Sequence, residues 1–165
     1  IFPAVRTAER EARYGFSEEF AYPPNEFVAY GSVDRPLAWK GLESLDGLRV
    51  GIMRGFSFGP RWEAYAAKGR VIVVPYETLD QGFELLERGR LDAVLGYRLT
   101  YDYHLRVSGA LARFGTAPPF DESRSFLMAR CDEVGRAALE AFDRGKRELR
   151  KSGAIQEILR RWQAR

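Results

Sequence analysis

The sequence predicts an α/β fold with a doubly wound parallel sheet, and two observations support this fold class. The expected strands are short continuous apolar runs, such as Leu48–Met53, instead of strict alternations of apolar and polar residues. Helical patterns lie between these runs, as over Thr78–Arg88, and parallel sheets covered by helices on both faces have strands of this kind. Hydrophobic residues make up 45% of the 165 residues, which is enough for a buried core.

The individual elements follow from caps, breakers and apolar runs. Thr7 and Thr78 are suited to cap helices, Pro60 suits a first helical position, and Gly89 and Gly96 suit the end of an element. The expected helical segments are, in order, Ala8–Arg13, Trp39–Leu45, Pro60 to about Ala67, Leu79–Arg88, Leu99–Val107, about Glu133–Lys151 and Ile155–Trp162. The expected strands are Glu26–Tyr30, Leu48–Met53, Val71–Val74, Leu91–Leu95, Leu111–Phe114 and Ser125–Ala129.

The composition excludes several classes of function. One cysteine and one histidine leave no disulfide framework and no cysteine- or histidine-rich metal site, so we expect no metal and no cofactor. The formal charge of +3 is small and dispersed, so we expect no nucleic-acid partner. No apolar run approaches the ~18–20 residues of a membrane span. The basic residues of the two closing helices alternate with acids, which predicts a solvated face.

Two segments carry candidate binding residues. Gly55, Phe56 and Ser57 directly follow the Leu48–Met53 strand, where the carboxyl end of a strand and a helix N-terminus suit an anionic ligand. The alternative is an ordinary strand–helix turn, with Phe56 in the core. Arg10, near Thr7 in the first short helix, offers a planar guanidinium that matches a carboxylate, and the alternative is a solvated surface arginine.

The remaining reactive residue types give no catalytic constellation. His104 has no serine and acid arranged around it as a triad would need, and we expect it to be a surface or half-buried residue. Cys131 has no histidine nearby, and we interpret it as structural or as the partner of a cysteine outside this chain. The sequence therefore predicts a protein that is not an enzyme.

Five segments, taken in order, resemble those of one protein family. They are Thr7–Arg10 with Tyr14–Phe20, Trp39–Ile52, Arg54–Ser57, Gly89–Gly96, and Leu149–Ile158 with Trp162. Their patterns are similar to "T-x-E-R … F-S-x-P-Y", "L-x-G-x-x-V-G-V", "G-[ST]-[ST]", "G-R-x-D-A-V-L-x-D" and "L-K-x-D-G-x-x-x-x-I-x-x-K-W". Together they resemble family 3 of the bacterial extracellular solute-binding proteins, the polar amino acid receptors of ABC transporters, which have the type II periplasmic binding fold.

The resemblance implies a two-lobed protein with doubly wound sheets whose lobe one is incomplete at its start. Residues 1–29 would form the end of lobe one, 30–120 lobe two, and 121–165 the return to lobe one. The hinge strands would be Glu26–Tyr30 and a segment near Pro118–Ser125. The chain begins at Ile1 without an export signal. We expect that signal in a missing N-terminal part, and a periplasmic location.

The resemblance also assigns roles to site residues. Arg10 would bind the carboxylate of the ligand, Thr7 would cap the nearby helix, and Ser57 would meet the same carboxylate through its backbone N–H and hydroxyl. Phe56, after Gly55, replaces a small hydroxyl residue, and Tyr97 replaces the aspartate that receives the ammonium of an amino acid. We do not expect Asp102 to supply the missing charge, which leaves a polar acid without an ammonium group as an alternative ligand.

The function implied is capture of a small polar, carboxylate-bearing solute, an amino acid or a related compound, between two lobes of a monomer. The partners would be the membrane subunits of an ABC importer. Two alternatives share the fold, namely a ligand-sensing domain of a receptor and a dehydratase-type enzyme similar to cyclohexadienyl dehydratases.

Overall fold

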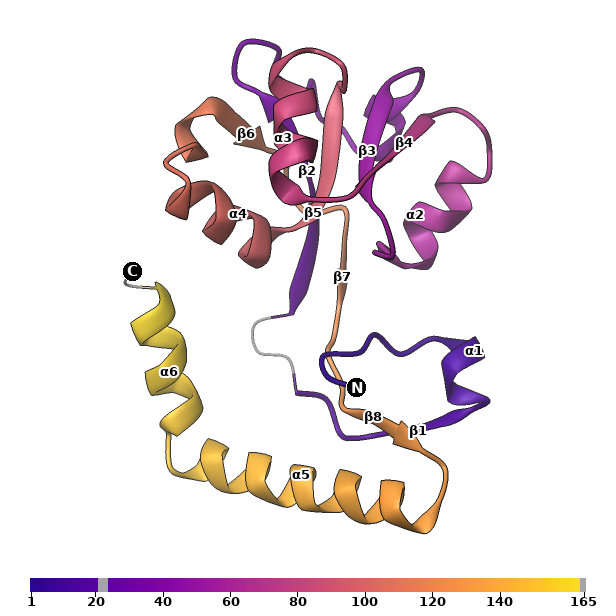
Figure 1. Cartoon of the computed structure of the whole chain (residues 1–165), viewed down its shortest axis with the longest axis vertical. Coiled ribbons are helices and arrows are strands. Elements are labelled where there is room, and N and C mark those ends of the chain that lie inside the picture. The colour runs from indigo at the N-terminus through magenta and orange to yellow at the C-terminus, as the bar shows by residue number, and fades with distance from the viewer. Residues whose placement is uncertain (21–23, 164–165) are drawn as a thin grey trace. The chain divides into compact units, whose positions relative to one another are not determined.

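The computed structural model describes residues 1–20 and 24–163, and the chain divides into two compact units. Unit 1 comprises residues 1–24 and 124–165, and unit 2 comprises residues 25–123. The chain enters unit 2 at the start of β2 (Asn25–Ser32) and leaves it at the end of β7 (Asp121–Ser123) (Figure 1). Asn25 pairs with Ser123, so the two crossings lie side by side. The predicted divisions after residues 29 and 120 fall within β2 and just before β7.

Unit 2 is built on a mixed sheet. Its strand order is β4-β3-β5-β2-β6, and β7 also pairs with β2. The further strands are β3 (Arg49–Met53), β4 (Ile72–Tyr76), β5 (Ala93–Tyr97) and β6 (Phe114–Thr116). The predicted parallel arrangement is correct for β3, β4 and β5, and it is wrong for β2, β6 and β7, which pair antiparallel. Parallel neighbours require long crossovers, and helices provide these from β3 to β4 and from β4 to β5.

Helices cover both faces of this sheet, as the continuous apolar strands predict. The helical elements of unit 2 are η1 (Leu42–Leu45), α2 (Gly59–Ala66), α3 (Leu79–Glu87), α4 (Arg98–Val107) and η2 (Leu111–Arg113). Strand β2 shows the two-sided burial clearly, because Phe27 and Ala29 lie in one core cluster while Val28 and Tyr30 lie in the other. Thr78 caps α3 as predicted, since its side chain accepts a hydrogen bond from the Gln81 backbone N–H.

Several boundaries in unit 2 differ from prediction, among them those of β2, which runs to Ser32, and of η1, which begins at Leu42. Strand β4 continues through Pro75, and it can do so because it is the edge strand of the sheet, where a missing N–H is tolerated. Strand β5 is shifted toward the C-terminus, which places Tyr97 at its last position. Residues 111–113 form a 3-10 turn instead of a strand, and strand pairing begins at Phe114.

Three buried tyrosines lie in the core on one side of this sheet. Tyr30, Tyr76 and Tyr101 are each 0–1% exposed. The Tyr30 hydroxyl donates to Asp102 at 2.8 Å, and the hydroxyls of Tyr76 and Tyr101 are hydrogen-bonded at 3.0 Å. Burial raises the pKa of Tyr76 to about 12, and burial is also the largest cause of the raised pKa of Tyr30 and of Tyr101.

We therefore expect unit 2 to lose stability as the pH rises from about 10 to about 12. An unfolded tyrosine ionises near 10.0 and folded Tyr76 near 12, so the unfolded chain releases its proton first. The stabilising effect is complete below the lower value and decreases by about 1.4 kcal/mol per pH unit above it. Thermal denaturation across this window would measure the loss, which should be shallower in Tyr76→Phe. Equal slopes for the two proteins would contradict the prediction.

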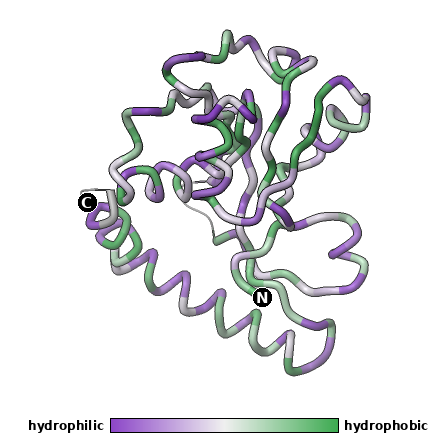
Figure 2. Tube along the Cα trace, turned by 45° about the horizontal axis from the view of Figure 1, so that its top comes forward, coloured by the Kyte–Doolittle hydropathy of each residue, from purple (hydrophilic) through white to green (hydrophobic). Residues whose placement is uncertain are grey.

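Over its described residues, unit 1 contains a two-stranded antiparallel sheet and three helices. Strands β1 (Tyr14–Phe16) and β8 (Met128–Arg130) pair, and β1 lies where the sequence analysis expected only the end of a helix. The helices are α1 (Ala8–Glu11), α5 (Glu133–Lys151) and α6 (Ala154–Gln163), and the last two lie where they were predicted. Figure 2 shows hydrophobic and hydrophilic residues alternating along α5, as expected of a helix with one apolar face.

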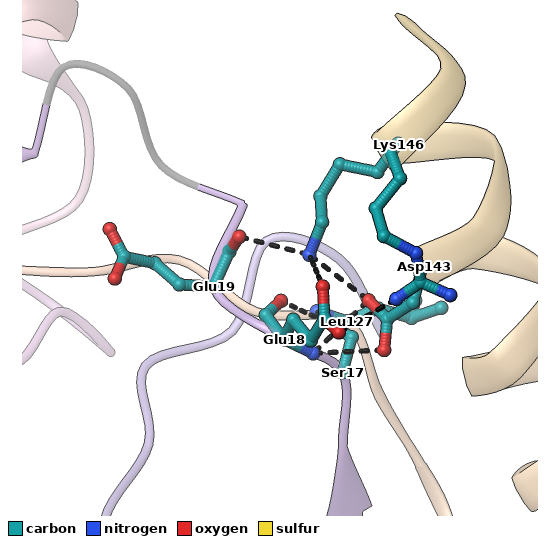
Figure 3. A network of polar contacts seen from close by, with 7 residues as sticks. Ser17, Glu18, Glu19, Leu127, Asp143 and Lys146 are labelled. Carbon is teal, nitrogen blue, oxygen red and sulfur yellow. Dashed lines mark hydrogen bonds and ion pairs between the residues drawn. The ribbon is translucent and has the colours of Figure 1, made fainter. Parts of the chain in front are cut away.

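A buried lysine joins α5 to the segment that follows β1 (Figure 3). The Lys146 side chain is 3% exposed, and its Nζ donates to the Glu19 carbonyl at 3.0 Å and to Asp143 Oδ1 at 3.1 Å. Asp143 in turn accepts hydrogen bonds from the Glu18 backbone N–H. The predicted solvated face of the closing helices is therefore wrong for Lys146, which is a structural cation of unit 1.

Candidate ligand-binding site

The loop after β3 is a tight turn that exposes its backbone. The Phe56 N–H donates to the Met53 carbonyl, and the Arg54 N–H donates to Tyr76 at the end of β4. Gly55 has a φ of +81°, a conformation that favours glycine, and no atom lies within 4 Å of the position that a Cβ would take. The sequence analysis selected Gly55 for close backbone approach, and the open space beside it is compatible with that role.

Tyr97 lies beside this loop because β3 and β5 are neighbouring parallel strands. Its hydroxyl donates to the Ser57 carbonyl at 2.8 Å. Its ring centroid lies 5.2 Å from that of Phe27, 5.2 Å from that of Phe56 and 5.5 Å from that of Phe58. Phe27 and Phe58 are buried, whereas Phe56 and Tyr97 are partly exposed. The structure therefore brings Gly55, Phe56, Ser57 and Tyr97 together at the carboxyl ends of β3 and β5.

The hydroxyl of Ser57 has a partner that the sequence analysis did not select. It donates to Glu63 Oε1 at 2.6 Å, across the first turns of α2. Among the residues that the structure describes, none accepts a hydrogen bond from the Ser57 backbone N–H. No motif indicated Glu63, because it is an exposed acid within an ordinary helix and only the fold of the loop places it against Ser57.

Thr7 and Arg10 belong to unit 1 and lie close to each other. The Thr7 side chain accepts a hydrogen bond from the Arg10 backbone N–H, so Thr7 caps α1 as predicted. The exposed Arg10 guanidinium donates from Nη1 to the Val5 carbonyl at 2.9 Å. Helix α1 ends at Glu11, before the predicted Arg13, because the chain turns into β1 at Tyr14.

Other polar residues of the sequence analysis occupy separate positions. Asp102 accepts a hydrogen bond from the Tyr30 hydroxyl. His104 Nε2 lies 3.0 Å from Asp80 Oδ1, and the imidazole ring is stacked on the ring of Phe83. Cys131 is a free, exposed cysteine. A cavity of about 120 Å³ is lined by α3, α4 and β6, and it includes none of the selected binding residues. Because none of those residues lines it, we locate the candidate site at the loop after β3.

Within residues 1–20 and 24–163, no group of three or more His, Cys, Asp or Glu side chains could hold a metal ion. Over the same residues, no helix is both long and apolar enough to cross a membrane.

Comparison with known proteins gives matches at the level of structure. No protein-family model matches the chain, and no curated protein matches it significantly. A mutant of ArgBP from T. maritima superposes with a TM-score of 0.82 at 21% identity, covering 99% of this chain and 67% of that one. An ABC uptake transporter substrate-binding protein from Streptococcus pneumoniae with bound histidine gives a TM-score of 0.80 at 21% identity, over 99% and 66% of the two chains.

A third structure extends the same pattern. The amino acid ABC transporter substrate-binding protein AbpA from Streptococcus pneumoniae, bound to L-arginine, gives a TM-score of 0.76 at 16% identity and covers 97% of this chain. The chain thus spans about two thirds of the length of these structures, namely 65–67%. The chain has the fold of the substrate-binding proteins of amino acid ABC transporters, which is the type II periplasmic binding fold that its motifs resemble.

Proposed function

We propose that the chain belongs to a solute-binding protein that captures a small polar, carboxylate-bearing solute, an amino acid or a related compound, for an ABC importer. The observation that carries the proposal is the meeting of the exposed loop at Gly55–Ser57 with Tyr97 at the carboxyl ends of two adjacent parallel strands. Ligands of open α/β sheets bind outside the carboxyl ends of the strands. The similar structures, which are named as binding proteins, support the same interpretation through the fold.

The roles of the site residues follow from their chemistry. The Arg10 guanidinium has five N–H donors in a planar fork, and the hydrogen bond to the Val5 carbonyl uses one of them, which leaves donors for the carboxylate of a solute. The Ser57 backbone N–H offers a second donor for the same group. Phe56 and Tyr97 present partly exposed rings that suit the carbon skeleton of the solute.

Capture in this proposal works by closure of two lobes on the solute. A bound solute favours the closed form only to the extent that it makes contacts there that the open form lacks. Arg10 in unit 1 and the loop after β3 in unit 2 would supply such contacts. We further propose a periplasmic location, a monomeric state and the membrane subunits of an ABC importer as the partner. A receptor sensing domain and a dehydratase-type enzyme remain the alternatives.

Replacing Arg10 with alanine should weaken binding of the solute by about tenfold to a hundredfold, because a charge-assisted hydrogen bond contributes about 1.5–3 kcal/mol. Titration calorimetry on the full-length protein with L-arginine, L-histidine and L-glutamine would measure this effect. Arg13→Ala is the matched control, since Arg13 is exposed and its guanidinium lies over the ring of Tyr14. Unchanged affinity in Arg10→Ala would contradict the role of Arg10 in binding. Dehydration of prephenate by the protein would instead favour the dehydratase-type enzyme.

A further inference from the structure

A carboxylate lies directly beside the proposed site. Glu63 of α2 is exposed, and its Oε1 accepts a hydrogen bond from the Ser57 hydroxyl at 2.6 Å. A second anion placed on that hydroxyl would meet the negative charge of Glu63 at close range, which is unfavourable. The Ser57 hydroxyl therefore suits the positioning of Glu63 better than the binding of a ligand carboxylate, while the Ser57 backbone N–H keeps its donor role.

Tyr97 is poorly suited to bind a cationic group by itself. Its side chain has no carboxylate, and its hydroxyl donates a hydrogen bond to the Ser57 carbonyl. The basic residues around the loop have partners of their own, since Arg54 pairs with Glu77 at 2.6 Å and Arg61 donates to the Phe120 carbonyl. Glu77 is thus engaged with Arg54, and Glu63 is the acid whose carboxylate contacts Ser57.

We propose that Glu63 binds the α-ammonium group of the ligand, an assignment that rests on the proposed function. An α-amino acid carries its carboxylate and its ammonium on one carbon, so the groups that bind them must be neighbours. Ser57 meets this requirement, because its backbone N–H is a donor for the carboxylate while its hydroxyl holds the oxygen of Glu63 next to it. The rings of Phe56 and Tyr97, with centroids 5.2 Å apart, add aromatic faces that attract cations.

Asp121 is the competing carboxylate in unit 2. Its Oδ2 lies 3.6 Å from the position that a Cβ on Gly59 would take, two residues after Ser57. Its Oδ1 accepts the Glu122 backbone N–H, so this side chain is engaged with its own strand. Glu63 is hydrogen-bonded to Ser57, and this contact distinguishes it from Asp121.

The test compares amino acids with analogues that lack the α-ammonium. Titration calorimetry on the full-length protein would use L-arginine, L-histidine and L-glutamine, each against its des-amino analogue, such as imidazolepropionate for L-histidine. The wild-type protein should prefer the amino acid, and Glu63→Gln should lower that preference about tenfold while binding of the analogue is unchanged. Glutamine retains an oxygen that accepts the Ser57 hydroxyl, so the loop keeps its geometry.

Two variants complete the design. Glu84→Gln is the matched control, because Glu84 is an exposed acid of α3 paired with Arg88 and it should leave the preference intact. The proposal is overturned if Glu63→Gln keeps the wild-type preference, or if Asp121→Asn abolishes it instead. Failure of the wild-type protein to bind any of the three amino acids would overturn the proposed amino acid ligand, and the assignment of Glu63 with it, before any variant is made.

Discussion

Replacing Gly135 with alanine should lower the free energy of unfolding of unit 1 by about 3 kcal/mol. A Cβ on Gly135 would lie 2.0 Å from the Arg130 carbonyl oxygen and 3.0 Å from the Arg130 carbonyl carbon. These are backbone atoms, so no side-chain rotation relieves the overlap and the turn at residues 130–135 must shift. That shift also disturbs the cap of α5, in which the Gly135 N–H donates to Asp132 at 2.8 Å. Overpacking costs about 1–3 kcal/mol and a lost cap about 1 kcal/mol.

The same helix offers a matched control at Gly145. No atom lies within 4 Å of the position of its Cβ, and its φ is not in the positive range, so alanine is accommodated without strain. Gly145→Ala should therefore stabilise unit 1 by about 0.5–1 kcal/mol through the higher helix propensity of alanine. Urea denaturation followed by far-ultraviolet circular dichroism would measure both variants. If both variants changed the free energy of unfolding by a similar amount in the same direction, the overlap with the Arg130 backbone would not be the cause of the change in Gly135→Ala.

Replacing Lys146 with methionine should destabilise unit 1 by about 3 kcal/mol. The change keeps a long apolar stem but removes the cation that pairs with Asp143, whose side chain is 14% exposed. It also leaves the Glu19 carbonyl without the hydrogen bond from Nζ. Removing one partner of a buried ion pair leaves an uncompensated charge, and this typically costs about 3–5 kcal/mol.

Two further variants separate the charge effect from packing. Lys151→Met changes an exposed lysine at the end of α5 and should alter stability by less than about 0.5 kcal/mol. Adding Asp143→Asn to Lys146→Met should restore part of the loss, because asparagine has no charge to leave unpaired and still accepts the Glu18 backbone N–H. A double variant no more stable than Lys146→Met would show that the unpaired charge of Asp143 is not the cause of the loss.

Much of the fold was predictable from local patterns. Thr7 and Thr78 cap helices as predicted, and α5 and α6 lie where the apolar spacing placed them. The apolar run of β2 indicated burial on both faces, and the structure confirms it. The direction of β2, β6 and β7 was not predictable in this way, because a buried strand has the same residue pattern in a parallel and in an antiparallel sheet.

By itself, the sequence determined the α/β class, the order of most elements and the segment around Gly55–Ser57 as a candidate binding loop. These depend on caps, turn residues and apolar runs, which act over a few neighbouring residues. Only the tertiary structure placed Glu63 against Ser57, joined the Tyr97 hydroxyl to the Ser57 carbonyl and placed Lys146 in a buried site. The burial and partners of a polar side chain depend on segments far away in the chain, and a solvated helix face and a buried ion pair have the same local sequence.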